Sequence, residues 1–226
     1  MNIFVTDPCP HKSAEVLPDK HIVKMPLETC QMLAVVYSKW YFNWGDELLH
    51  KKDGNPYNTK KGAFRGHPCT VWAAEDFKNT AWLIAHGVAL CYEYYKRYGK
   101  VHSCSDTVNE ARQVFLKYSN QEDLTSSREV KTFAFAGPDE FKFDTSIDTF
   151  TAYKRYIASK PWAASNYLRD PSKKPNWLWL NYGGYGSMHS DHSQTSEPKN
   201  MTITLLWYGL LYFSAILSLT ALLLAE

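Results

Sequence analysis

A long uncharged segment near the C-terminus constrains the architecture of this chain more than any other feature. Residues 202–225 read TITLLWYGLLYFSAILSLTALLLA and contain no charged side chain. A helix of this length spans about 36 Å, whereas the hydrocarbon core of a bilayer is about 30 Å thick. A buried core helix is the alternative, but the segment is apolar on all sides and follows a polar linker at residues 186–201. We therefore predict a transmembrane anchor at residues 202–226.

The charges around this segment predict which side of the membrane the preceding domain occupies. Lys173, Lys174 and Lys199 precede the apolar run, and only Glu226 follows it. Positive residues favour the cytoplasmic side. The five cysteines follow no small-domain disulfide spacing, and the start of the chain, MNIFVTDPCP, lacks the features of a signal peptide. We expect the domain to lie in the cytoplasm, anchored at the inner face of the membrane.

Hydrophobic periodicity before the anchor predicts a mainly α fold. Apolar residues recur at helical spacing, and neither an internal repeat nor a clear β-sheet pattern is present. Pro8 and Pro10 predict a loop near the start. The predicted architecture is a compact single helical domain at residues 1–185, followed by the C-terminal transmembrane helix. The predicted helices cover residues 19–41, 70–98 with Gly99 as the cap, 106–118, and a fourth that Ser146 caps and that ends near residue 159.

The first predicted helix combines a proline with a stripe of polar residues. Pro26 lacks a backbone N–H, so we expect either a kink or a helix that restarts with Pro26 in its first turn. His21, Lys24 and Glu28 are spaced so that they share one face of a regular helix. One interpretation is a solvated stripe with a Lys24–Glu28 ion pair. The other is a pocket near the N-terminus at which these side chains converge.

Basic and aromatic residues alternate from residue 153 to residue 185. The whole chain is nearly balanced, with 25 Lys and Arg against 23 Asp and Glu, so only this local pattern bears on nucleic-acid binding. Cations contact phosphates and flat rings stack on exposed bases. Core aromatics with a basic flank that favours an anionic membrane surface are the alternative. The candidate DNA contacts in this run are Lys154, Arg155, Arg169, Lys173, Lys174 and Trp177.

Three Cys/His pairs raise the question of a metal. Zinc binds such ligands, but a spacing of one intervening residue is not that of a zinc finger, and no C-x-x-C is present. We predict no metal site, and a zinc-dependent hydrolase is kept as a third functional alternative. The pairs are Cys9 and His11, His67 and Cys69, and His102 and Cys104.

Four motifs carry a family resemblance. They are DKHIVKMPLET at 19–29, HPCTVWAAEDF at 67–77, KRYGK at 96–100 and KKPNWLWLNYGG at 173–184. Together they resemble the pyrimidine-dimer DNA glycosylase family, the endonuclease V type of repair enzyme, and are similar to uncharacterised phage proteins with DKHxVKM and HPCxVW signatures. In the family a D-x-H element precedes the catalytic glutamate, and Asp19, His21 and Glu28 keep its spacing of nine residues. The resemblance spans residues 1 to about 185.

This resemblance implies an all-α enzyme that acts on damaged duplex DNA and needs neither a metal nor a cofactor. In the family the N-terminal α-amine attacks the deoxyribose carbon beneath a damaged base, forms a Schiff base and cuts the strand by elimination. An α-amine with an ordinary pKa of about 7.7–8.0 is partly neutral, and so nucleophilic, near pH 7. By resemblance Glu28 is the catalytic carboxylate, His21 accompanies it, and Arg97 of KRYGK contacts DNA.

The sequence departs from the family pattern around its nucleophile. The family exposes the amine of a small residue after methionine removal, but position 2 here is Asn2, whose size disfavours that removal. Met1 would then supply the amine. Leu27 and Gln31 stand where the family has arginines. Lys20 and Lys24 are expected either to replace those arginines at phosphates or to supply the nucleophile, since a lysine beside another cation has a lowered pKa.

We therefore predict a DNA-damage-processing glycosylase/AP lyase that works through an amine Schiff base, with Met1 or Asn2 as the amine and with Glu28 and His21 in the site. The alternative is a membrane-anchored, non-catalytic nucleic-acid-binding or interaction protein of phage origin, located in the host cytoplasm. Lys20 and Lys24 complete the set of predicted DNA contacts.

Overall fold

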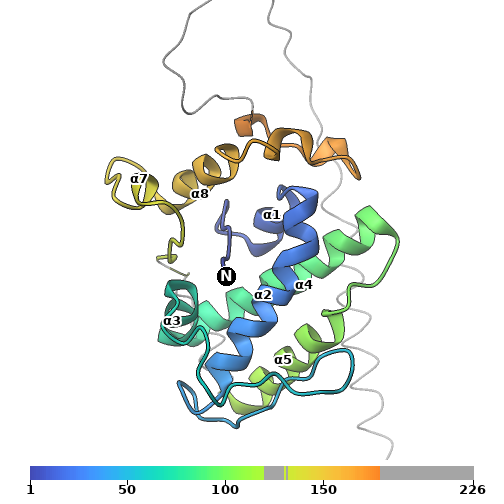
Figure 1. Cartoon of the computed structure of the whole chain (residues 1–226), viewed down its shortest axis with the longest axis vertical. Helices are drawn as coiled ribbons and strands as arrows, with labels where there is room; N and C mark the ends of the chain where they lie inside the picture. The colour runs from blue at the N-terminus through green and yellow to red at the C-terminus, as the bar shows by residue number, and fades with distance from the viewer. Residues whose placement is uncertain (120–129, 131, 179–226) are drawn as a thin grey trace, which may run out of the picture. The chain divides into compact units, whose positions relative to one another are not determined.

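The computed structural model describes residues 1–119, 130 and 132–178. Every regular element in this part of the chain is a helix, and an isolated bridge between His50 and Pro56 is its one β feature. The fold is therefore mainly α, as predicted. The elements are α1 (Pro10–Glu15), α2 (Asp19–Tyr37), α3 (Pro68–Glu75), α4 (Phe77–Tyr98), α5 (Ser105–Tyr118), α7 (Asp139–Lys142), α8 (Thr149–Ala158) and the 3-10 helices η1 (Ala163–Ser165), η2 (Pro171–Lys173) and η3 (Asn176–Leu178) (Figure 1).

The C-terminal predictions lie outside the described residues. The chain divides into two units, Met1–Gly184 and Tyr185–Glu226, and the description stops within the first of them at residue 178. The linker at 186–201 and the anchor at 202–226 thus stay predictions, as does the location at a membrane. Among the residues that the structure describes, no helix is long and apolar enough to cross a bilayer.

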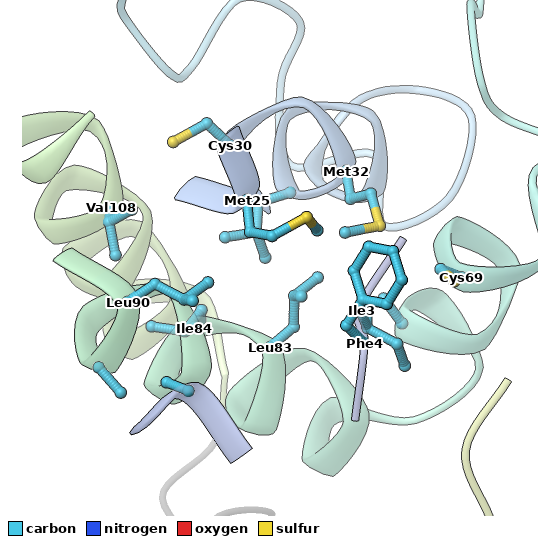
Figure 2. Packing of buried hydrophobic residues seen from close by; sticks show 14 of the residues in the cluster. Ile3, Phe4, Met25, Cys30, Met32, Cys69, Leu83, Ile84, Leu90 and Val108 are labelled. Carbon is cyan, nitrogen blue, oxygen red and sulfur yellow. The ribbon is translucent and has the colours of Figure 1, made fainter. Parts of the chain in front are cut away.

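Helix α4 is the centre of the packing, since it contacts α1, α2, α3 and α5. Figure 2 shows Leu83 and Leu90 of α4 in the same buried cluster as Met25 of α2, and each of the three is at most 1% exposed. Full burial of such a side chain contributes about 1.5–3 kcal/mol. Gly87 allows α2 and α4 to approach closely, because a Cβ added there would lie 2.8 Å from Cγ2 of Thr29.

The first residues of the chain run through the interior instead of along the surface. Ile3 and Val5 are at most 1% exposed, and Figure 1 shows the N-terminus among the helices. Phe4 has a φ of 41°, which turns the backbone in a conformation that few side chains adopt. Ser13 holds this turn, because its hydroxyl accepts a hydrogen bond from Thr6 N at 3.0 Å and donates to Phe4 O at 3.4 Å. The terminal amine consequently lies against the helical domain and not at the end of a free tail.

Helix α2 is continuous through Pro26, so the predicted restart at this proline does not occur. Its N-terminus is capped from far along the chain: the main-chain oxygen of Asn166 accepts from Asp19 N at 2.9 Å, and its Oδ1 accepts from Lys20 N at 2.8 Å. The helix ends at Tyr37, four residues before the predicted end at residue 41. Because the helix is unbroken, His21, Lys24 and Glu28 keep their shared face.

The predicted helix at 70–98 is two helices, α3 and α4. Asp76 separates them with an extended backbone, φ −150° and ψ 139°, and its Oδ1 accepts from Lys78 N at 2.8 Å to cap α4. The capping hydrogen bond of Asp76 thus divides the segment into two helices, although its apolar periodicity is continuous. Gly99 ends α4 in the left-handed conformation, φ 65°, as predicted. Helix α5 begins one residue before its predicted start.

Two further boundaries differ from prediction. Pro10 begins the short helix α1 instead of fixing a loop, because a proline in the first turn forfeits no helical hydrogen bond. Helix α8 begins at Thr149, and Asp148 caps it by accepting from Thr151 N at 2.6 Å. Ser146, the predicted cap, instead donates its backbone N–H to Asp144 Oδ1 at 3.0 Å.

Candidate active site

A cavity of about 340 Å³ lies where the N-terminal segment, α2, and α8 with the residues just after it meet. The polar stripe of α2 forms one wall, so the pocket interpretation of that stripe holds, together with the Lys24–Glu28 ion pair. Segments more than 130 residues apart in sequence form this one cavity. Its lining residues are Met1, Asn2, Phe4, Lys20, His21, Lys24, Met25, Glu28, Tyr156, Lys160 and Trp162.

An amine and a carboxylate meet in this cavity. The α-amine of Met1 lies 4.0 Å from Oε2 of Glu28, and the Met1 and Glu28 side chains are 2% and 10% exposed. Lys24 Nζ lies 3.1 Å from the other carboxylate oxygen, but its side chain is 70% exposed. Glu28 therefore lies between the chain-terminal amine on one side and a solvent-facing ammonium on the other.

Asn2 fixes the position of the terminal amine. Its Nδ2 donates to the carbonyl oxygen of Ala136 at 2.5 Å, and its Oδ1 accepts from the backbone N–H of Ile3 at 2.9 Å. The residue is 6% exposed. Because both ends of the amide are bonded to main chain, Asn2 restricts the motion of the residue before it, which is Met1.

Aromatic rings form a second wall of the cavity. The imidazole of His21 stacks on Phe4, with ring centroids 4.1 Å apart and planes at 18°. Trp162 meets the same imidazole edge-on at 5.4 Å, and Tyr156 stacks on Phe4 at 5.7 Å. Such rings offer flat apolar faces to a sugar or a base.

His21 is uncharged at neutral pH. Burial, with smaller contributions from the positive charges of Lys160 and Lys24, lowers its pKa to about 3. Its Nδ1 is buried and has no hydrogen-bond partner among the described residues. The imidazole can therefore hydrogen-bond a ligand, but it carries no proton to donate as an imidazolium near pH 7.

Cations surround the cavity. Lys20 Nζ lies 4.7 Å from the centroid of the Trp162 ring, and Lys160 Nζ lies 4.0 Å from that of Tyr156. Of the described residues that line the cavity, Glu28 alone is acidic. The cavity as a whole is thus suited to a polyanion that carries flat rings.

The histidines of two Cys/His pairs have local roles. His67 Nδ1 accepts from Cys69 N at 3.2 Å at the start of α3, and His102 Nδ1 accepts from Cys104 N at 3.1 Å near the start of α5. In the described part of the chain, no group of three or more His, Cys, Asp and Glu side chains is arranged to hold a metal ion. In these two pairs the spacing of two residues therefore reflects a local hydrogen bond, in which the histidine side chain accepts from the backbone N–H of the cysteine.

The charges of the terminal amine and of Glu28 also act on His67. Its pKa is lowered mainly by burial and then by the positive charge of the chain terminus, while the negative charge of Glu28 raises it. This histidine thus belongs to the electrostatic surroundings of Met1 and Glu28, although it does not line the cavity.

Arg97 does not make the DNA contact predicted for it. Its guanidinium is fully buried: Nη1 donates to Leu17 O at 2.8 Å and to Asp19 Oδ1 at 3.1 Å, and Nη2 donates to Glu15 O at 2.8 Å. Nε lies 3.6 Å from Glu93 Oε2. Arg97 instead ties the end of α1 and the start of α2 to α4.

The remaining predicted DNA contacts lie outside the cavity. Arg155 pairs with Asp144 at 3.1 Å, Lys173 pairs with Glu15, and Arg169 Cζ lies 5.2 Å from the ring of Tyr98. Trp177 packs against the hydrophobic core. Lys154 and Lys174, both partly buried, complete this set.

Six of the predicted site residues line this cavity, and five further residues line it that the sequence does not single out: Phe4, Met25, Tyr156, Lys160 and Trp162. The six are Met1, Asn2, Lys20, His21, Lys24 and Glu28. Tyr156, Lys160 and Trp162 belong to the basic and aromatic run, so the sequence shows their residue types. It does not show that these residues lie opposite α2. Phe4 carries no sequence signal, because its position depends on the turn at its own positive φ.

The model of the pyrimidine dimer DNA glycosylase family matches residues 1–106. This match confirms the family resemblance for slightly under half of the chain, and it supports a glycosylase-like function with DNA as the substrate. It includes the Met1 and Glu28 pair, whereas Tyr156, Lys160 and Trp162 lie beyond its end. No curated protein and no solved structure matches the chain.

Proposed function

We propose that this protein is a DNA glycosylase with AP-lyase activity in which the α-amine of Met1 is the nucleophile. Glu28 accepts protons and stabilises the positive charge of the intermediate. The observation that carries the proposal is the 4.0 Å separation between that amine and Glu28 Oε2 within one cavity. The family match over residues 1–106 supports the same class of reaction.

The first step exchanges the base for the amine. Glu28 accepts a proton from the terminal ammonium, and the neutral amine attacks C1′ of the damaged nucleotide. The N–C1′ bond forms while the bond from C1′ to the base breaks, and the base leaves with the electron pair and takes up a proton. The sugar ring then opens, with O4′ taking a proton, which leaves a protonated imine between Met1 and C1′.

The second step cuts the strand. Loss of a proton from C2′, with Glu28 as the nearby base, expels the 3′ phosphate, which departs with the electrons of its C–O bond. Water then adds to the imine carbon and releases the free amine. A carboxylate beside the imine favours its positive charge, so Glu28 stabilises the covalent intermediate as well as moving protons.

Two arrangements favour Met1 over the lysines as the nucleophile. Lys24 is paired with Glu28 at 3.1 Å and its side chain is 70% exposed, whereas the Met1 side chain is 2% exposed and the Met1 amine is held by the anchored segment at Asn2. Lys20 has its ammonium over Trp162. We assign Lys20, Lys24 and Lys160 to the phosphates around the reacting nucleotide.

The replacement Glu28→Gln tests this proposal, because it keeps the shape of the side chain and removes its charge. We expect base release from ultraviolet-irradiated duplex DNA to fall by about 10²–10⁴-fold. DNA affinity, measured by fluorescence anisotropy, should be unchanged or higher. Glu75→Gln, a matched change at an exposed glutamate outside the cavity, should leave the rate as it is. A Glu28→Gln rate within twofold of the unmodified protein would overturn the assignment.

A further inference from the structure

A second cavity adjoins the catalytic one. It has a volume of about 280 Å³ and is lined by Asp19, Lys20, Val23, Tyr98, Asn166, Leu168 and Arg169. Lys20 lines both cavities, so they share a wall at the start of α2. The proposed chemistry makes no use of this second cavity.

Leu168 stands at the rim of the second cavity and is 80% exposed, the largest value among the exposed large hydrophobic residues that the structure describes. A single exposed leucine is common on protein surfaces and carries no meaning alone. Here, however, a second exposed apolar residue lines the same cavity, since Val23 on α2 is 46% exposed. Together they form an apolar edge beside Lys20, which also lines the catalytic cavity.

The backbone that carries Leu168 is firmly attached on both sides. Asn166 accepts two hydrogen bonds from the start of α2, at 2.9 and 2.8 Å. The hydroxyl of Tyr167 donates to Val16 O at 2.7 Å, and Arg169 N donates to Asp19 Oδ2 at 3.0 Å. With both neighbours fixed, the Leu168 side chain projects into solvent from a rigid base, and little order is lost when it inserts into a partner.

The charges around this edge suit a nucleic acid. Arg169 lies over Tyr98, with Cζ 5.2 Å from the ring centroid, and Lys20 lies over Trp162 on the other side. An apolar side chain with a cation on each flank complements a polyanion whose interior is a stack of flat rings. Because Lys20 lines both cavities, a polyanion bound in the catalytic cavity would also lie beside this edge.

We infer that Leu168 is a wedge that enters the DNA base stack beside the nucleotide in the catalytic cavity, while Arg169 and Lys20 hold the flanking phosphates. This inference rests on the proposed function. A nucleotide that reaches the Met1 amine has to leave the helix, and apolar wedges such as leucine are used to unstack and kink duplexes at such points. Leu168 is therefore a positioning residue, because it does not contact the reacting atoms.

The test compares a duplex with a single strand. Leu168→Ala should reduce kcat/KM at least tenfold on a damaged duplex but less than twofold on a single-stranded abasic oligonucleotide, which needs no unstacking. Leu116→Ala on α5, an exposed leucine that lines neither cavity, should change neither rate. Unchanged duplex activity, or an equal loss on both substrates, would overturn the inference.

A second measurement separates this inference from the proposed chemistry. The full-length protein is bound to a duplex that carries 2-aminopurine next to a tetrahydrofuran abasic site, which cannot form an imine. The unmodified protein should raise the 2-aminopurine fluorescence severalfold, and Leu168→Ala should abolish this rise at saturating protein. If the rise is seen while no substrate is cut, the proposed function fails and the wedge stands. If both proteins give the same signal, the wedge is wrong.

Discussion

The α-amine of Met1 lies 4.0 Å from Glu28 Oε2, inside a cavity that also contains three lysines and a set of stacked rings. The chain reaches this arrangement by burying residues 2–6 and bonding both ends of the Asn2 amide to main chain. Terminal residues are ordinarily mobile. An amine held in this way is in position to react.

The identity of residue 2 should decide where the amine lies. Asn2→Ala presents a small residue that favours removal of Met1, so the amine moves back by one residue and away from Glu28. We expect loss of base release by at least 100-fold, with the shortened mass seen by intact-protein mass spectrometry. Asn2→Gln is the control, because its large side chain keeps Met1. Full activity in a protein that has lost Met1 would show that the position of this amine is unimportant.

Arg97 should prove structural. Arg97→Met leaves the carboxylates of Asp19 and Glu93 buried without their guanidinium partner, and breaking a buried pair in this way costs about 3–5 kcal/mol. Urea unfolding followed by tryptophan fluorescence measures the loss. Arg112→Met, at an exposed position on α5, should cost at most about 0.5 kcal/mol. A change below about 1 kcal/mol for Arg97→Met would contradict the structural role assigned here.

Stability should fall when the pH drops below 6.5. Burial is the main cause that lowers the pKa of His21 and of His86 from 6.5 to about 3 in the folded protein. Below pH 6.5 the unfolded chain binds protons that the folded protein does not, so the stability due to these histidines is complete above pH 6.5 and is lost progressively toward pH 3. Urea midpoints at pH 7.5 and 4.5 measure this.

His86→Leu isolates one of the two groups. His86 is completely buried, stacks on Trp82 at 4.8 Å, and has no hydrogen-bond partner for either ring nitrogen among the described residues. Replacing it with leucine should reduce the difference between the two urea midpoints, since one titrating group is gone. An equal difference in the variant and the unmodified protein would mean that His86 does not contribute.

Local sequence signals predicted much of the fold. The end of α4 at Gly99 and the presence of α5 were both predicted, because a helix cap and an apolar helix face depend on residues that are close together in the sequence. The sequence does not reveal the break at Asp76, since an acidic cap within a continuous apolar pattern resembles an ordinary surface residue. The restart predicted at Pro26 does not occur, because the packed face of α2 outweighs one lost hydrogen bond.

One wall of the candidate cavity could be predicted on α2 and near the N-terminus, where spacing and family resemblance both point to Glu28. The opposite wall was not, because Tyr156, Lys160 and Trp162 reach α2 only through long-range packing. The predicted DNA contact of Arg97 is wrong for a related reason. Its partner Asp19 lies 78 residues away in the sequence, so the buried ion pair between them is not visible there.

Borohydride trapping tests the central claim most directly. Full-length protein is incubated with duplex DNA that carries an abasic site, the imine is reduced, and the adduct is mapped by peptide mass spectrometry. We predict a single covalent adduct on the α-amine of Met1, lost when the N-terminus is extended by a glycine. An adduct on Lys20 or Lys24, or no adduct on DNA that the protein binds and cleaves, would contradict the claim that the Met1 amine is the nucleophile.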